Sequence, residues 1–274
     1  MRAAIDFGIS NIDAIAEIDG ALHRWTLPSN GAPNESSVRQ ILAAGGISLE
    51  SLPALTVTGG RHTALPPRLG GTEIVAIAEI TAIARGGQLL ADASSPDTGA
   101  PVLVISAGSG TAIVTARDGQ YTHVTGTGVG GGTLLGLGRL LLGTVDVALI
   151  DAMASRGDAN GVDLALRDVV SGPIGTLPPD ATAVNFGRLA RTRDDPAPDD
   201  LAAALMTLVG QVIAITAINA ARAERITRLV LVGHMADLHS FRTVLALVGK
   251  YYGTEIIVPA HAGHGTVLGA LMSA

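Results

Sequence analysis

A carboxylate stands at the end of the first apolar segment of the chain, directly before a turn of small and polar residues. The residues of this segment that could do chemistry are Asp6, Gly8, Ser10 and Asn11. Backbone amides in such a turn bind phosphate oxygens, and a carboxylate beside them can hold Mg²⁺ directly or through water. The segment therefore predicts a phosphate-binding hairpin with Asp6 as the metal-binding residue. The alternative is that Asp6 only caps its own turn.

A second turn of this kind follows the apolar residues 102–106 and leads into a returning strand at 111–116. Its residues are Gly108, Ser109 and Gly110. Because 2–7 and 13–18 flank the first turn in the same way, two strand–turn–strand units occupy comparable positions in the two halves of the chain. Such a pair of hairpins is characteristic of the actin-like ATPase fold, in which ATP lies between two lobes. We therefore expect an α/β protein with this two-lobed, ribonuclease H-like fold.

The segment from Gly126 to Gly131 has the pattern GxGxxG and precedes an apolar helix at 133–142. A dinucleotide-binding interpretation needs this motif at the first strand–helix turn, with an acidic residue about 20 residues later. Asp151 lies at that distance, but the motif follows an antiparallel meander in the middle of the chain. A loop that only caps a packed helix is a second alternative. We favour a third, in which bare backbone amides at the helix start hold a phosphate.

The sequence around this motif resembles that of the type II (eukaryotic-like) pantothenate kinases, which have the actin-like ATPase fold. The longest similar segment runs from His123 to Gly143, HVTGTGVGGGTLLGLGRLLLG. Shorter similar segments follow in the family's order at 151–154, 157–158, 162–163, 167–168, 185–187, 231–233 and 265–271. The resemblance extends over nearly the whole chain and is strongest from residue 102 onward.

The resemblance implies that Glu79 is the catalytic carboxylate, at the start of the helix that follows the strands of the first lobe. A carboxylate at that place orients or deprotonates the attacking hydroxyl, while ATP and Mg²⁺ supply the electrophile and the charge neutralisation. The alternative is that Glu79 is a solvated helix residue.

The resemblance also implies binding roles for residues of the second half. Three glycines match the loop that closes over the phosphates of ATP: Gly130, Gly131 and Gly132. Gly233 belongs to the turn on the adenosine side, and His123 and Thr125 occupy substrate-binding positions. Ser109 matches a serine that contacts an acyl-CoA inhibitor or nearby substrate groups, so an acyl-CoA feedback ligand is expected.

The chain departs from the pattern of this family at several positions. Ile9 replaces the second glycine of the phosphate hairpin, and Thr81 stands where an aspartate usually follows the glutamate. Asp13 stands where the family has a lysine, and an aspartate would repel the phosphate that a lysine would neutralise. His123 replaces an arginine that grips the polar end of the substrate, and a neutral imidazole lacks the bidentate fork and the permanent charge. These departures bear on the substrate rather than on the fold.

The composition excludes several classes of protein. Of 274 residues, 47% are hydrophobic and 15% charged, which excludes a disordered chain. A net charge of −6 with 3% aromatic residues argues against a nucleic-acid partner. The absence of cysteine removes disulfides, thiolate metal sites and cysteine nucleophiles. We expect a cytoplasmic protein, because no signal-like apolar segment opens this sequence.

Residues 201–221 carry no charge and are long enough to span a membrane. Thr207, Gln211 and Asn219 lie four and eight residues apart and form a polar stripe on one helical face. A buried helix without a membrane partner is therefore expected. Because the apolar faces of helix 201–222 exceed what one small lobe can cover, we also expect a homodimer that packs partly through it.

Turn-forming residues at 92–101 predict the boundary between two lobes. The first lobe, 1–99, would carry the first hairpin and the catalytic glutamate, with a helix over 74–90. The second lobe, 100–274, would carry the second hairpin, the glycine loop and the adenosine side.

Three functions remain open from the sequence. The leading one is an ATP- and Mg²⁺-dependent kinase that phosphorylates pantothenate, the first step of coenzyme A biosynthesis. The second is a kinase of the same fold with a different small alcohol as acceptor. The third is a nucleotide- or acyl-CoA-binding protein with little catalytic activity.

Overall fold

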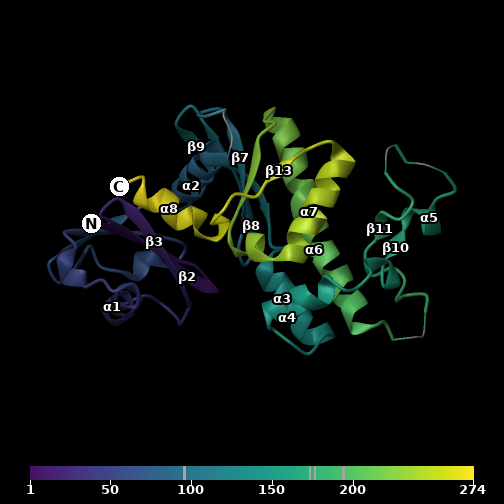
Figure 1. Cartoon of the computed structure of the whole chain (residues 1–274), viewed down its shortest axis with the longest axis horizontal. Helices are drawn as coiled ribbons and strands as arrows, with labels where there is room; N and C mark the ends of the chain where they lie inside the picture. The colour runs from purple at the N-terminus through teal and green to yellow at the C-terminus, as the bar shows by residue number, and fades with distance from the viewer. Residues whose placement is uncertain (95–96, 173, 176, 193–194) are drawn as a thin grey trace.

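The computed structural model describes all residues except 95–96, 173, 176 and 193–194. Its first sheet is built from the N-terminal segments of the chain, drawn in purple and blue in Figure 1. The strand order in this sheet is β3-β2-β1-β4-β6-β5. The strands are β1 (Arg2–Phe7), β2 (Asn11–Ile18), β3 (Ala21–Pro28), β4 (Ala54–Thr58), β5 (Arg68–Leu69) and β6 (Thr72–Ala76). Strand β1 pairs antiparallel with β2 on one side and parallel with β4 on the other.

The second sheet repeats this pattern in the order β13-β12-β7-β8-β9. Its strands are β7 (Val102–Ala107), β8 (Thr111–Arg117), β9 (Gln120–Thr127), β12 (Leu229–Val232) and β13 (Ile256–Ile257). Strand β7 pairs antiparallel with β8 and parallel with β12, as β1 does with its neighbours. The expected duplication is therefore confirmed, since each sheet has a central strand that ends in a hairpin.

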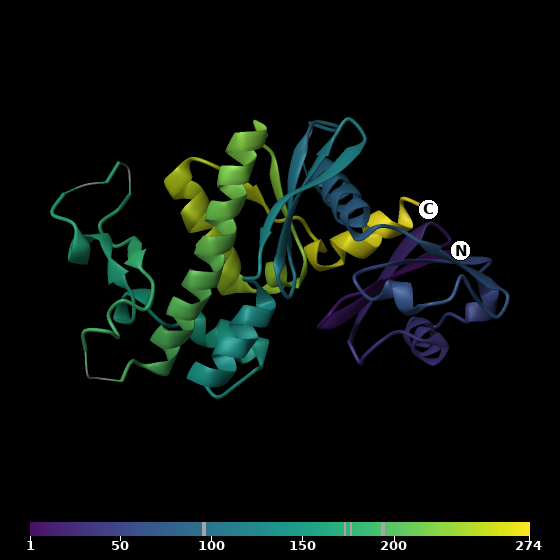
Figure 2. The same cartoon turned by 180° about the vertical axis from the view of Figure 1, so that it is seen from behind.

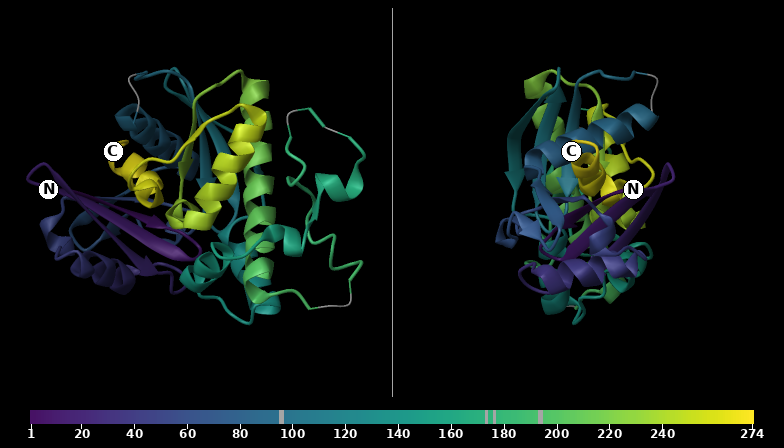
Figure 3. Two further views of the ribbon diagram at one scale, coloured as in Figure 1. Left: turned by 45° about the vertical axis from the view of Figure 1, so that its right-hand side comes forward. Right: turned by 90° about the vertical axis from the view of Figure 1, so that its left-hand side faces the viewer.

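The helices form layers around the two sheets (Figure 3). α2 (Glu79–Ser94) and α8 (Gly265–Leu271) pack against each other between the sheets, where they share an apolar core with β7, β12 and β1. α1 (Glu35–Ala44) covers the outer face of the first sheet. α6 (Pro198–Glu224) and α7 (His239–Tyr252) cover the outer face of the second.

The remaining elements are short. The helices are α3 (Gly131–Leu141), α4 (Val147–Ala154) and α5 (Leu166–Val169), and the single-turn helices are η1 (Leu49–Ser51), η2 (His62–Ala64), η3 (Ala159–Gly161), η4 (His234–Asp237) and η5 (Ala262–His264). Strands β10 (Leu164–Ala165) and β11 (Thr182–Val184) pair with each other beyond α6, away from the two main sheets (Figure 1).

The helix expected over 74–90 begins later than the sequence indicated. Residues 72–76 form β6, which pairs parallel with β4 through Leu55 and Ile74, and α2 begins at Glu79. The long-range pairing with β4 decides the conformation of this apolar segment, whose own pattern suits either element. The boundary between lobes at 99 and 100 stays a prediction, and 95–96 lie outside the described residues. α8, from the second half of the sequence, contacts the first sheet.

Helix α6 crosses the outer face of the second sheet (Figure 2). It is the one helix in the described part of the chain that is long and apolar enough to span a membrane, yet 67% of its most apolar window is buried inside the protein. From its polar stripe, Gln211 accepts a hydrogen bond from Asn185 at 3.3 Å. The expected buried helix is thus present. Other parts of the same chain cover most of the α6 face that we expected to support a dimer. The exposed apolar side chains of the described residues include Leu140, Val145 and Leu149 near α3 and α4.

Glycines allow α2 and α8 to cross at backbone contact. A β-carbon added at Gly86 would overlap the carbonyl of Gly265, and one added at Gly269 would overlap the carbonyl of Ala82. Because these neighbours are backbone atoms rather than flexible side chains, they cannot give way without moving a helix. The separation of the two sheets therefore depends on the absence of side chains at this crossing.

We predict that Gly269→Ala destabilises the protein by about 1–3 kcal/mol, because the methyl group forces the two helices apart. The matched control is Gly136→Ala in α3, where an added β-carbon would meet nothing within 4 Å. The control should gain about 0.5–1 kcal/mol, since alanine loses less backbone entropy in a helix. Urea unfolding of both variants measures the difference. Equal stability of the two would show that the crossing tolerates a side chain.

Candidate active site

The two predicted hairpins meet at the edge where their central strands end. The hydroxyl oxygens of Ser10 and Ser109 lie 2.8 Å apart and share a hydrogen bond. In the first hairpin, Gly8 is required because an added β-carbon would lie 2.6 Å from the carbonyl oxygen of Asn11. Ser29 also donates a hydrogen bond to the carbonyl of Gly8 at 3.0 Å, which fixes the turn against β3. The two turns singled out from the sequence therefore lie against each other, while their binding of ATP phosphates stays a prediction.

The glycine loop packs directly on the second hairpin. The amides of Gly131 and Gly132 donate hydrogen bonds of 2.8 Å to the carbonyls of Gly108 and Ser109. A β-carbon at Gly130 would lie 2.8 Å from the carbonyl oxygen of Ser109. The expectation of bare amides at this helix start therefore needs correction, because two of these amides already have acceptors. What the glycines provide here is close approach between the loop and the hairpin; their role in binding ATP stays a prediction.

Carboxylates gather beside the first hairpin. Gly59, at φ 88°, packs so closely that an added β-carbon would overlap Asp6 and lie 2.7 Å from the carbonyl oxygen of Phe7. The next residue, Gly60, approaches Glu79, whose Oε2 would lie 3.8 Å from a β-carbon at Gly60. Burial, together with the charges of Asp13 and Glu79, raises the pKa of Asp6 from 3.8 to about 7. Glu79 itself is exposed at the first turn of α2, where a negative charge is also favourable to the helix.

Asp13 joins the two sheets through polar contacts that the sequence did not reveal. Its Oδ1 lies 2.8 Å from Nε2 of His234 and accepts a hydrogen bond of 2.6 Å from Thr26. Nδ1 of His234 lies 2.7 Å from Oδ2 of Asp237. His264 packs edge-on against His234, with ring centroids 5.8 Å apart. Hydrogen bonds to Asp13 and Asp237 raise the pKa of His234 to about 10, whereas burial lowers that of His264.

The turn after β12 places His234 beside the second hairpin. Gly233 has φ 95°, and its amide donates a hydrogen bond of 2.9 Å to the carbonyl of Ala262. A β-carbon at Gly233 would lie 2.5 Å from the carbonyl oxygen of Ala107, the last residue before the hairpin glycine. Only glycine fits this position, because both the positive φ and the contact exclude a side chain. His234 is therefore held at the base of the second hairpin.

The predicted substrate residues lie on the edge strand β9. His123 is exposed and pairs with Val114, and Thr125 pairs with Ile113 across a β-bulge. Within the described residues, no hydrogen bond or ion pair joins His123 to Glu79 or to either hairpin. The structure thus brings the two hairpins and Glu79 into one region, while the substrate-binding roles of His123 and Thr125 stay predictions.

Asp151 accepts hydrogen bonds from the N-terminus of α7. Its carboxylate accepts hydrogen bonds from the amides of His239 and Ser240 at 3.0 and 2.8 Å, and from the hydroxyl of Ser240. It therefore satisfies free amides at a helix N-terminus. The dinucleotide-binding alternative, which needed this carboxylate for a ribose, is excluded.

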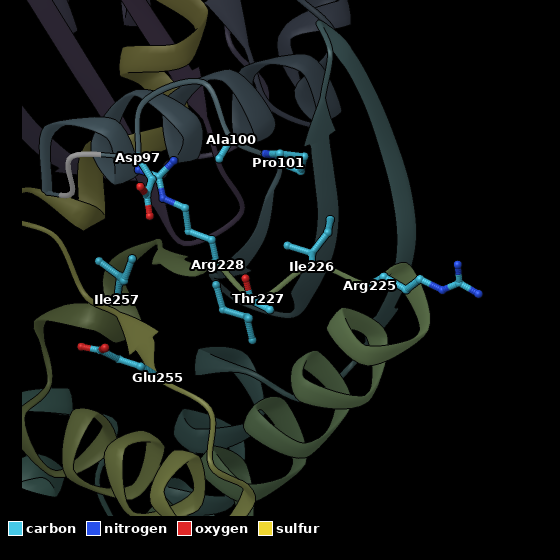
Figure 4. A pocket seen from close by; sticks show the side chains of 10 residues that line it. Asp97, Ala100, Pro101, Arg225, Ile226, Thr227, Arg228, Glu255 and Ile257 are labelled. Carbon is cyan, nitrogen blue, oxygen red and sulfur yellow. The ribbon is translucent and has the colours of Figure 1, made fainter.

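A cavity of about 320 Å³ lies elsewhere, and its lining includes Arg228 and Glu255 (Figure 4). These residues precede β12 and β13, so the cavity lies at the end of the second sheet opposite the hairpins. Arg228 is 9% exposed and forms an ion pair of 2.7 Å with Asp92 of α2. The cavity is separate from the candidate active site.

Comparison with solved structures establishes the class of fold. The activator of 2-hydroxyisocaproyl-CoA dehydratase from Clostridium difficile, with bound ADPNP, matches with a TM-score of 0.65 at 16% identity, covering 100% of this chain and 93% of that one. A ROK family glucokinase from Streptomyces griseus, in complex with glucose and AMPPNP, matches with a TM-score of 0.63 at 11% identity, covering 100% and 98%. The protein has the two-lobed actin-like ATPase fold, as expected.

Sequence comparison then identifies the family. The sequence profile described as Fumble matches residues 84–273, so the chain belongs to the Fumble family. It is 27% identical over 273 residues to a type II pantothenate kinase from Oceanobacillus iheyensis, with 99% of each chain covered. It is also 27% identical over 272 residues to one from Staphylococcus aureus, with 99% of this chain and 97% of that one covered. The resemblance to type II pantothenate kinases is confirmed.

We predict that Asp6 makes the stability of the protein depend on pH. Its folded-state pKa of about 7 lies above the value of 3.8 for an unperturbed aspartate. The native protein therefore retains a proton that the unfolded chain loses, and the contribution of Asp6 to the free energy of unfolding falls as the pH rises through this interval. Asp6→Asn should match the wild type in stability near pH ~3, below both pKa values, and exceed it near pH ~8.

Urea unfolding of wild type and Asp6→Asn at both pH values measures this dependence. If the variant is less stable than the wild type at the higher pH, then Asp6 is stabilised in its charged form and the assignment of the cause is wrong.

Proposed function

We propose that the protein is an ATP-dependent kinase that phosphorylates pantothenate to 4′-phosphopantothenate, the first step of coenzyme A biosynthesis. The observation that carries the proposal is the contact between the two hairpins at Ser10 and Ser109, with the carboxylates of Asp6 and Glu79 beside it. Solved proteins of this fold hold ADPNP or AMPPNP, and relatives that match along the whole chain are type II pantothenate kinases.

The residues at the hairpins are suited to Mg²⁺ that arrives with ATP. The described residues contain no cluster of three or more histidine or acidic side chains that could hold a metal ion. Mg²⁺ does not need such a cluster, because it keeps several waters and binds through one or two carboxylates together with substrate phosphates. Asp6 fits that role, since burial and neighbouring carboxylates make its charge unfavourable without a cation. When bound, Mg²⁺ supplies charge neutralisation at the phosphates of ATP.

In the proposed mechanism, the hairpin residues position the phosphates and Glu79 acts on the acceptor. The amides of both turns donate hydrogen bonds to phosphate oxygens. The oxygen of the acceptor's primary hydroxyl forms a bond to the γ-phosphorus while Glu79 accepts the proton of that hydroxyl. The proton then passes from Glu79 to solvent. The bond from the γ-phosphorus to the bridging oxygen breaks, and its electron pair leaves with ADP. Most of the catalysis comes from positioning rather than from base strength.

A kinase with another small alcohol as acceptor is the second candidate, and His123 favours it. The family's arginine fork is absent there, so this chain would hold a carboxylate less firmly than its relatives do. The observation on which this rests is a histidine, exposed on an edge strand, at the expected substrate position. A homodimer, an acyl-CoA feedback ligand and a cytoplasmic location also stay predictions.

Release of ADP tests the proposed function. Purified protein is supplied with ATP and Mg²⁺ and, in separate reactions, with pantothenate, pantetheine, pantoate or a sugar. ADP release that depends on pantothenate supports the proposal, and release with another alcohol alone supports the second candidate. ATP binding without acceptor-dependent release would identify a binding protein with little turnover.

We predict that Glu79→Gln lowers kcat by about 10²-fold or more, because glutamine keeps the shape but cannot accept the proton. The dissociation constant of ATP should stay nearly unchanged, since the proposed ATP contacts belong to the hairpins and the glycine turns rather than to Glu79. The matched control is Glu73→Gln on β6, an exposed glutamate that precedes the site in sequence. Steady-state kinetics and nucleotide titration give both quantities, and wild-type turnover of Glu79→Gln would make Glu79 an ordinary helix residue.

We predict that His123→Arg lowers the KM for pantothenate, because a guanidinium restores a permanent charge and two parallel donors for its carboxylate. Pantetheine, which lacks that carboxylate, provides the control acceptor and should show no gain. A KM that is unchanged for pantothenate would indicate that position 123 does not face the acceptor.

A further inference from the structure

Three carboxylates, those of Asp6, Asp13 and Glu79, lie close enough at the candidate site to influence one another. Asp6 and Asp13 are direct partners across the β1–β2 ladder, and Glu79 contributes to the raised pKa of Asp6. Among the ion pairs of the described residues, these three carboxylates take part in a single one, between Asp13 and His234. A polyphosphate that approaches the hairpins would therefore meet negative charge at this site, and His234 is the cation directly paired with one of these carboxylates.

The contacts of His234 define its protonation state. Each ring nitrogen faces a carboxylate oxygen, with Nε2 2.8 Å from Asp13 and Nδ1 2.7 Å from Asp237. An ionised carboxylate only accepts hydrogen bonds, so both nitrogens must donate and the ring must be an imidazolium. The side chain is still 28% exposed, so its charge also reaches the solvent side of the site.

The position of His234 connects both hairpins. It follows Gly233, which packs on Ala107 immediately before the second hairpin, and it contacts Asp13, which follows the first hairpin. The sequence alone indicated that Asp13 would repel phosphate. In the folded protein that carboxylate is already neutralised by a cation from the other sheet.

We propose that His234 is a positioning residue for the nucleotide, whose imidazolium holds Asp13 across the two sheets and supplies a positive charge beside both phosphate hairpins. This inference rests on the proposed function, because it assumes that ATP phosphates bind at the hairpins. The inference adds His234, in the turn after β12, to the site, where its positive charge neutralises the negative charge of Asp13 on β2.

The test compares the binding of ATP with Mg²⁺ and of adenosine to wild type and His234→Gln by titration calorimetry. Glutamine can still donate a hydrogen bond to Asp13 but carries no charge. The dissociation constant of ATP should rise about tenfold, because a charge near the phosphates is lost, and the difference should shrink in high salt. Adenosine, which has no phosphate, should bind as before. The matched control is His239→Gln, which changes an exposed histidine at the start of α7.

The double variant Asp13→Asn/His234→Gln removes both members of the pair and should recover most of the lost ATP affinity, since the local net charge returns to that of the wild type. Circular dichroism verifies that each variant is folded. ATP affinity within twofold of wild type in His234→Gln overturns the inference, and so does an equal loss for ATP and adenosine, which would indicate a purely structural role. Wild-type protein that binds no ATP would instead refute the proposed function, and this inference with it.

Discussion

The contact between the Ser10 and Ser109 hydroxyls is possible only because the two sheets approach closely enough for their hairpins to meet. That approach is set by α2 and α8, which lie between the sheets and cross at backbone contact through Gly86 and Gly269. A side chain at either glycine would increase the distance between α2 and α8. Because protein interiors are close-packed, this displacement would also move the hairpin tips apart. The geometry of the candidate site is therefore decided in the core, away from the polar residues themselves.

The site concentrates negative charge beside a place where we propose that a polyanion binds. Asp6 is buried with two other carboxylates nearby, which raises its pKa and makes its ionised form unfavourable. Such a cluster of carboxylates lowers the stability of the folded protein, and it is typical of sites whose charged groups bind a ligand. The imidazolium of His234 offsets part of this charge and also links β2 of the first sheet to the turn after β12 of the second. Electrostatic balance and connection between the lobes are thus combined in one side chain.

Much of the architecture could be predicted from the sequence, because each hairpin is a local pattern of an apolar strand followed by glycine and serine. The family resemblance also predicted the order of the motifs along the second half of the chain. Prediction failed where contacts between distant segments decide the outcome: residues 72–76 form a strand that pairs with β4 and β5. The pair of Asp13 and His234 is separated by 221 residues, so no local pattern could reveal it. The amides of Gly131 and Gly132 were expected to be free, but the second hairpin supplies their acceptors.

The central claim is that phosphates bind between the two hairpins, and an engineered crosslink tests it most directly. The chain contains no cysteine, so within one molecule the double variant Ser10→Cys/Ser109→Cys can form only the disulfide that joins the hairpins, and non-reducing electrophoresis separates it from disulfides between molecules. The account predicts that this disulfide forms on oxidation, that ATP with Mg²⁺ slows its formation, and that the crosslinked protein loses ATP binding until it is reduced. Crosslinked protein that binds ATP as well as its reduced form would contradict the account.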